Sequence, residues 1–175
     1  QTFKVHADPA LGDILEGAFR PGFFTGVSTV VMKLFMAVFA GKVQGVAVFG
    51  KKDYQQLMVI RQMVRQFALP IEVLGVETCR AEDGLALSSR NGYLSEPERN
   101  QALQLSMALR ELGRGALAAA EALTRHLPAL EAKAMEDLRQ SGWQPESIAC
   151  RIEQPHCPSL GPSEILGKRN GCAEG

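Results

Sequence analysis

The chain has 175 residues, 46% hydrophobic and 22% charged, the balance of a globular protein with one medium domain or two small ones. Its 19 basic and 19 acidic residues cancel, and no polybasic run occurs, so the charge favours neither a nucleic-acid nor a membrane partner. The most apolar stretch, residues 27–49, is interrupted by Lys33, Lys42 and Gln44, which argues against a membrane span.

The start of the chain and its cysteines indicate a cytoplasmic protein. The sequence begins at Gln1, without Met and without the apolar core of a signal peptide, so we expect a processed chain or a fragment. The four cysteines show no CxxC spacing, which favours reduced thiols over a disulfide framework or a zinc site.

The first half of the chain predicts a helix, a strand, a second helix and a second strand. Apolar residues recur at helical spacing over residues 27–38, and Gly41 ends that helix. Residues 46–49 and 71–76 are short apolar runs typical of buried strands. The helix between them starts near Asp53, a candidate cap, and stops before Pro70; its predicted buried face is Leu57, Ile60, Val64 and Phe67.

A strand, helix and strand joined by short connections predict an α/β fold with a parallel sheet. Ligands of such sheets lie beyond the carboxyl ends of the strands, here after Phe49 and Val76.

The second half changes character. Two helices are predicted at residues 97–112 and 116–139, the second with Leu123, Leu127, Leu130, Ala134 and Leu138 on one face, and a short strand follows at 147–152. We therefore divide the chain into residues 1–87, a small α+β domain at 88–154, and a poorly ordered tail at 155–175.

Two segments contain residues suited to binding an anion. Gly50, Lys51, Lys52 and Asp53 come directly after the first strand, where a helix N-terminus and a lysine together can hold a phosphate. Leu87, Ser88, Ser89 and Arg90 form a loop rich in hydrogen-bond donors. Each segment alone also fits an interpretation without a ligand: a solvated lysine pair beside a plain N-cap for the first, and an ordinary turn for the second.

Together, in this order, the two segments closely resemble the pantothenate synthetase family. The resemblance covers residues 11–150 and is carried by Leu15-Glu16-Gly17-Ala18, Arg20-Pro21-Gly22, the block from Phe49 to Gln56, and above all the block from Asp83 to Leu94. It implies an α/β chain that forms the later part of a Rossmann-like nucleotidyltransferase domain, followed by the small α+β domain acting as a lid.

The resemblance also implies roles for individual residues. Gly50, Lys51, Lys52 and Asp53 match the family's ATP-binding loop, with Lys52 at the phosphates and Asp53 towards the ribose. Gln56 matches a glutamine that holds pantoate, and the backbone at Cys79 lies where the adenine ring binds. Leu87, Ser88, Ser89 and Arg90 match a mobile segment that closes on the triphosphate; Lys52 and Arg90 would stabilise charge at phosphorus.

The activity implied is an ATP-dependent ligation of pantoate with β-alanine through a pantoyl adenylate, with Mg²⁺ accompanying the nucleotide and no metal site of the chain's own. Full-length members would be homodimers. The family's N-terminal HIGH-type loop, which contributes histidines to the phosphates, has no counterpart here, because His6, His126 and His156 lie in unrelated contexts. Phe23 stands where a histidine is usual, and residues 157–175 do not resemble the family's usual ending.

Three hypotheses follow. The chain is a pantothenate synthetase sequence that is inactive alone, a non-catalytic remnant keeping a partial ATP site or dimer surface, or another adenylate-forming relative such as a tRNA-charging enzyme. The neutral charge disfavours tRNA binding. In the parent fold the strand at 46–49 lies inside a larger sheet. Without its other strands, we expect an exposed sheet face and a partly bared 27–38 helix.

Overall fold

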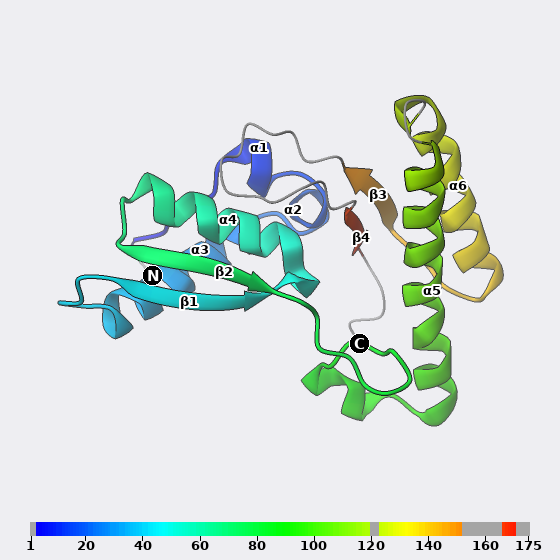
Figure 1. Ribbon diagram of the computed structural model, residues 1–175, viewed down its shortest axis with the longest axis horizontal. Helices are drawn as coiled ribbons and strands as arrows, with labels where there is room; N and C mark the ends of the chain where they lie inside the picture. The colour runs from blue at the N-terminus through cyan, green and yellow to red at the C-terminus, as the bar shows by residue number, and fades with distance from the viewer. Residues whose placement is uncertain (1–2, 120–122, 152–165, 171–175) are drawn as a thin grey trace. The chain divides into compact units, whose positions relative to one another are not determined.

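The computed structural model describes residues 3–119, 123–151 and 166–170. The chain forms two compact units, Gln1–Cys79 and Arg80–Gly175 (Figure 1). The domain boundary predicted from the sequence, between residues 87 and 88, lies a short distance further along the chain.

The first unit contains the two predicted helices and two predicted strands, together with three short helical segments that the sequence analysis did not predict. In chain order these are α1 (Pro9–Gly12), α2 (Glu16–Phe19), α3 (Phe23–Val38), β1 (Gly45–Gly50), the 3₁₀ helix η1 (Lys51–Asp53), α4 (Tyr54–Gln66) and β2 (Ile71–Val76). The strands β1 and β2 pair in parallel, from Gly45 opposite Ile71 to Gly50 opposite Val76, with α4 as the connection between them. The predicted parallel α/β arrangement is confirmed.

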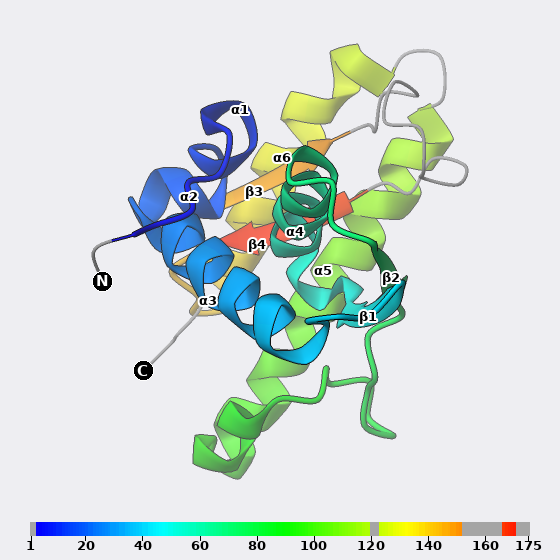
Figure 2. The same cartoon turned by 90° about the vertical axis from the view of Figure 1, so that its left-hand side faces the viewer.

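Both long helices of this unit cover the same face of the two strands (Figures 1 and 2). Ala47 of β1 and Ile71 of β2 point into a core built mainly by α4 and closed by Phe35 of α3. From α4 this core receives Ile60, Met63 and Val64. Ile60 has no exposed surface, so α4 is packed closely against the sheet.

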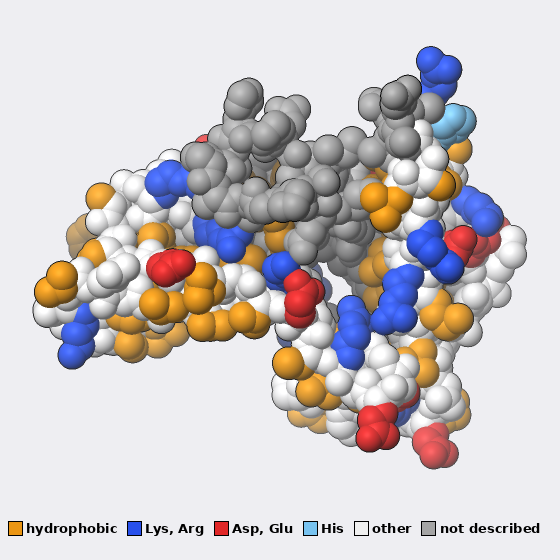
Figure 3. Space-filling view, in the orientation of Figure 1, with side chains coloured by type: hydrophobic (Ala, Val, Ile, Leu, Met, Phe, Trp, Pro, Cys, Tyr) orange, Lys and Arg blue, Asp and Glu red, His pale blue; other side chains and the backbone are white. Residues whose placement is uncertain are grey.

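The opposite face of the sheet is open within the described residues. Four of its side chains are apolar and 40–58% exposed, namely Val46 51%, Val48 58%, Leu74 40% and Val76 44%, and the exposed Glu72 lies on the same face, opposite Val46. Figure 3 shows hydrophobic side chains gathered over these strands. On α3, Val30, Leu34 and Val38 are exposed too. The expected exposure of a sheet face and of part of the 27–38 helix is confirmed.

The predicted buried face of α4 is right for Leu57, Ile60 and Val64 and wrong for Phe67, which is 54% exposed. Phe67 lies just past the end of α4, and the backbone turns away at Ala68 with a positive φ of 48°. The helical spacing therefore does not extend to it. Asp53 does occupy the N-cap position of α4, but its side chain makes no capping hydrogen bond.

The second unit contains η2 (Ser89–Tyr93), α5 (Glu96–Ala119), α6 (Leu123–Gln140), β3 (Ser147–Arg151) and β4 (Leu166–Asn170). The helices α5 and α6 pack together around Leu112, Ala134, Leu138 and Ile148, and β3 pairs with β4 in antiparallel fashion. The strand β4 lies within the tail predicted to be poorly ordered; the rest of that tail, and Ile152 of the predicted strand, lie outside the described residues.

The predicted break between these helices at residues 113–115 is wrong, since α5 continues to Ala119. A glycine inside a helix costs only about 1 kcal/mol, which packing can offset. A Cβ on Gly115 would come within 3.0 Å of Leu130 Cδ2, so this glycine allows α5 and α6 to approach closely. No described helix combines the length and the apolar character needed to cross a membrane.

The open sheet face predicts self-association of the chain. A substitution Val48→Lys should reduce it, because the new charge opposes burial of this face against a second copy. Met107→Lys is the matched control, since Met107 is similarly exposed but lies on α5. Sedimentation velocity at micromolar concentration and the fluorescence of a hydrophobic dye measure the effect. A wild-type chain that stays monomeric and binds no dye would contradict this prediction.

Candidate functional site

The turn at the carboxyl end of β1 presents a cation and a carboxylate to solvent. The chain leaves β1 at Gly50, passes through η1 and enters α4 at Tyr54. Lys52 and Asp53 are exposed, and Lys52 makes no ion pair or hydrogen bond with the part of the chain that the structure describes. The first N–H groups of a helix lack intrahelical partners and favour anions. A lysine next to a helix N-terminus is a combination suited to a phosphate.

Lys51, in contrast, has a partner. Its Nζ lies 2.6 Å from Oε1 of Glu77, the residue that follows β2, so the pair links the carboxyl ends of the two strands. Lys51 is partly buried and Glu77 is largely exposed, and a pair this accessible to water adds little stability. Of the two adjacent lysines, Lys51 is thus paired within the described residues and Lys52 is not.

Gln56 and Gln55 stand side by side in the first turn of α4 but differ in environment. Gln56, the predicted pantoate residue, is partly buried. Gln55 is 3% exposed, and its amide bonds to backbone groups of the segment before α3. The sequence analysis assigned Gln55 no role. Its spacing of four and eight residues from the buried Val59 and Met63 puts it on a buried face, which is the signal that could have identified it.

The second group, Leu87 to Arg90, lies in the second unit. A bridge between Arg80 and Ala86 and a hydrogen bond from the Ala81 N–H to the Leu85 oxygen (2.8 Å) close a small loop ahead of it. Leu87, Ser89 and Arg90 are exposed; Ser88 is partly buried, and its Oγ accepts a hydrogen bond from the Arg90 N–H at 3.2 Å. Cys79, the last residue of the first unit, is exposed.

Asp83 anchors this loop from within the second unit. Its Oδ1 accepts a hydrogen bond from the Leu85 N–H at 3.0 Å, and its Oδ2 lies 2.6 Å from a guanidinium nitrogen of Arg99 on α5. The hydrogen bond from Leu85, assisted by Arg99, lowers the pKa of the Asp83 carboxyl below its usual value. The same helix begins with a capping box, in which the Glu98 carboxylate accepts from the Ser95 N–H at 2.8 Å and the Ser95 Oγ accepts from the Glu98 N–H at 3.5 Å.

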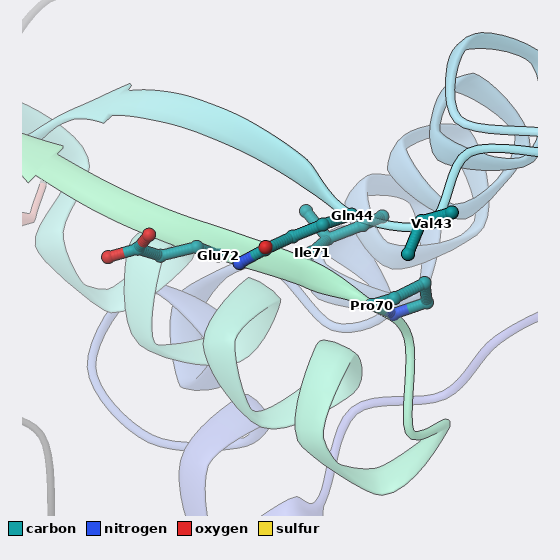
Figure 4. Close-up of a pocket in the computed structure, with 5 residues that line it drawn as sticks. All are labelled: Val43, Gln44, Pro70, Ile71 and Glu72. Carbon is teal, nitrogen blue, oxygen red and sulfur yellow. The ribbon is translucent and has the colours of Figure 1, made fainter.

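A hollow lies at the other end of the sheet. It is lined by Val43, Gln44, Pro70, Ile71 and Glu72, at the amino ends of β1 and β2 (Figure 4). Its lining contains no basic group that could meet a phosphate. Ligands of parallel sheets bind at the carboxyl ends of the strands, so this hollow is not the candidate site. Among the described residues, no group of three or more histidines, cysteines and carboxylates could hold a metal ion.

Removing the charge of Asp83 should loosen the loop that precedes Leu87. In Asp83→Asn the N–H of Leu85 and the guanidinium of Arg99 lose a charged acceptor. In the wild type, the lowered pKa means that the contact is present above the ordinary value of 3.8 and is lost as the pH falls through the pKa of the folded state. The NMR shift of the Leu85 amide should follow this titration, and Asp83→Asn should abolish it. Asp137→Asn, on the exposed side of α6, is the control; identical titrations in all three proteins would contradict the prediction.

Comparisons with known proteins agree on one family. The family model described as pantoate-beta-alanine ligase matches residues 2–158. Pantothenate synthetase of Paracidovorax citrulli is 61% identical over 151 residues, and that of Leptothrix cholodnii is 65% identical over 151 residues; each alignment covers 86% of this chain. The chain spans about half the length of these relatives, 52% and 50%.

Solved structures give the same result. Pantoate-β-alanine ligase (pantothenate synthetase) from Thermus thermophilus is 36% identical, with a TM-score of 0.71, and the match covers 95% of this chain and 59% of that one. The ligase from Francisella tularensis, complexed with β-γ ATP and β-alanine, is 26% identical, with a TM-score of 0.62 and coverage of 87% and 50%. These matches confirm the Rossmann-like α/β class and the predicted resemblance. The chain belongs to the pantoate–β-alanine ligase family.

Proposed function

We propose that this chain carries part of the active site of a ligase that joins pantoate to β-alanine at the expense of ATP. The observation that carries the proposal is the exposed pair Lys52 and Asp53 at the carboxyl end of β1, with Lys52 unpaired among the described residues. The names of the relatives and the nucleotide complex of the Francisella tularensis ligase support it.

In the proposed reaction a carboxylate oxygen of pantoate attacks the α-phosphorus of ATP, and pyrophosphate leaves. The amine of β-alanine then attacks the carbonyl carbon of the adenylate, AMP leaves, and an amide is formed. Little covalent chemistry falls to the protein, so its task is to position the reactants and stabilise charge. Mg²⁺ would arrive on the phosphates of ATP and neutralise part of their charge.

Each predicted residue has a role in this proposal. Lys52 neutralises charge on the phosphates, and Arg90 can do so through two parallel hydrogen bonds. Asp53 accepts hydrogen bonds from ribose hydroxyls, Gln56 donates to pantoate, and the backbone at Cys79 meets the adenine. The loop from Leu87 to Arg90 closes on the triphosphate, and the small second domain acts as a lid. We further propose a cytoplasmic homodimer for the full-length protein.

A second candidate function is nucleotide binding without catalysis. In it the chain keeps a partial ATP site or a dimer surface, since Lys52 and Arg90 can hold phosphates without the rest of a catalytic site. Both candidates share the ATP contacts at Lys52 and Arg90. They differ in turnover, which separates them by experiment.

The affinity of the chain for ATP tests the contacts that both candidate functions share. Lys52→Ala and Arg90→Ala should each weaken MgATP binding by about 1.5–3 kcal/mol, the scale of a hydrogen bond to a charged group. Lys42→Ala is the control, because Lys42 is also exposed but precedes β1 instead of following it. Titration calorimetry should also show that affinity falls with rising salt. Equal affinities in the wild type and all three variants would rule out the site.

The rate of pantothenate formation tests whether the chain catalyses the reaction. Loss of one preorganised charge-stabilising donor typically slows an enzyme by about 10²- to 10³-fold. We therefore expect these 175 residues alone to form pantothenate at least that much more slowly than the Thermus thermophilus ligase. Product is measured by mass spectrometry with pantoate, β-alanine and MgATP. Comparable rates would show that the residues present here suffice for catalysis.

A further inference from the structure

The side chain of Gln55 joins α4 to the segment at the start of the first unit. Its Nε2 donates to the backbone oxygens of Leu11 at 2.8 Å and of Ile14 at 2.7 Å. Its Oε1 accepts from the N–H of Glu16 at 3.3 Å. The side chain is 3% exposed, so breaking these bonds without replacing them would leave buried polar groups unsatisfied.

The backbone that Gln55 holds is strained. Leu15, between two of the residues that bond to Gln55, has φ 50° and ψ −123°, a conformation that a residue with a Cβ rarely adopts. Such strain persists only where the surroundings enforce it, and it is concentrated at functional positions. Gly12 and Gly17 flank the turn so closely that a Cβ on Gly17 would lie 1.7 Å from the Gly12 oxygen.

A second glutamine on α4 strengthens the attachment. Gln62, two helical turns after Gln55, donates from Nε2 to Oδ2 of Asp8 at 3.2 Å. The other oxygen of Asp8 accepts from the Ala10 N–H at 2.9 Å and caps α1. Positions seven apart lie on one face of a helix, so residues 8–16 are fastened along a single face of α4.

We propose that Gln55 is a positioning residue for ligand binding: through the strained turn at Leu15 it fixes the first turn of α4, and with it Asp53 and Gln56. The proposal rests on the function proposed above. Asp53 and Gln56 lie within two residues of Gln55 in sequence, at the start of the helix that Gln55 anchors. On its other side this helix is fixed to the sheet by Leu57 and Ile60. The hydrogen bonds of Gln55 therefore hold the side of the helix that the sheet does not. A ligand that needs donors in fixed places then meets them preorganised.

The test compares Gln55→Glu with Gln66→Glu, the same change at the exposed last residue of α4. At pH 8 the carboxylate introduced at position 55 can donate to neither backbone oxygen, so pantoate affinity should fall about tenfold or more while Gln66→Glu leaves it unchanged. Burial favours the protonated carboxyl, which can donate to one oxygen, so part of the loss should be recovered as the pH is lowered. Affinities are measured by calorimetry on the full chain with saturating MgATP analogue and refer to the folded fraction.

Gln55→Met keeps the neutral charge and the length of the side chain, and it replaces Gln55→Glu if that variant does not fold. Weaker pantoate binding in a folded Gln55 variant, with pH-dependent recovery for the glutamate, supports the proposal. Unchanged affinity of the folded fraction, with only a lowered unfolding midpoint, shows that Gln55 is merely structural and overturns it. A wild-type chain that binds neither ATP nor pantoate contradicts the proposed function itself, and this proposal with it.

Discussion

The parallel pairing of β1 and β2 is the constraint on which the first unit depends. It places Gly50 beside Val76, so both strands end at the same edge and Lys51 comes within reach of Glu77. It also requires a connection that returns to the start of the sheet, and α4 provides it. Because α4 starts directly after β1, its first turn lies at the edge where parallel sheets bind ligands.

The same pairing leaves the unit incompletely covered. Parallel sheets are normally buried on both faces, yet α3 and α4 cover only one face here, and Val46, Val48 and Leu74 are exposed on the other. The proposed chemistry is incomplete in a similar way: cations are present on two loops, but no HIGH-type loop occurs in these residues. Since the chain matches about half of each relative, we infer that further residues of the family would both cover this face and complete the phosphate contacts.

Local patterns predicted the elements well where one periodicity dominates, as in β2, whose bounds match those observed, and in α4. They failed where tertiary packing decides. Phe67 continues the helical spacing but follows the end of the helix, and Gly115 looks like a break but serves a close approach to Leu130. The hydrogen bond from Gln55 to Leu11 joins residues 44 positions apart, and no local sequence pattern contains that contact. The residue roles at the site came from motif resemblance, because a lysine pair or a serine-rich loop alone fits several functions.

Complementation offers the most direct measurement of whether this chain supplies one part of a shared active site. The portion of the Leptothrix cholodnii enzyme that this chain does not match would be co-expressed with it, and pantothenate formation measured. Our interpretation predicts activity that neither part shows alone, that is lost in Lys52→Ala and that is kept in Lys42→Ala. No activity from a folded, co-purifying complex, or activity indifferent to Lys52→Ala, would contradict it.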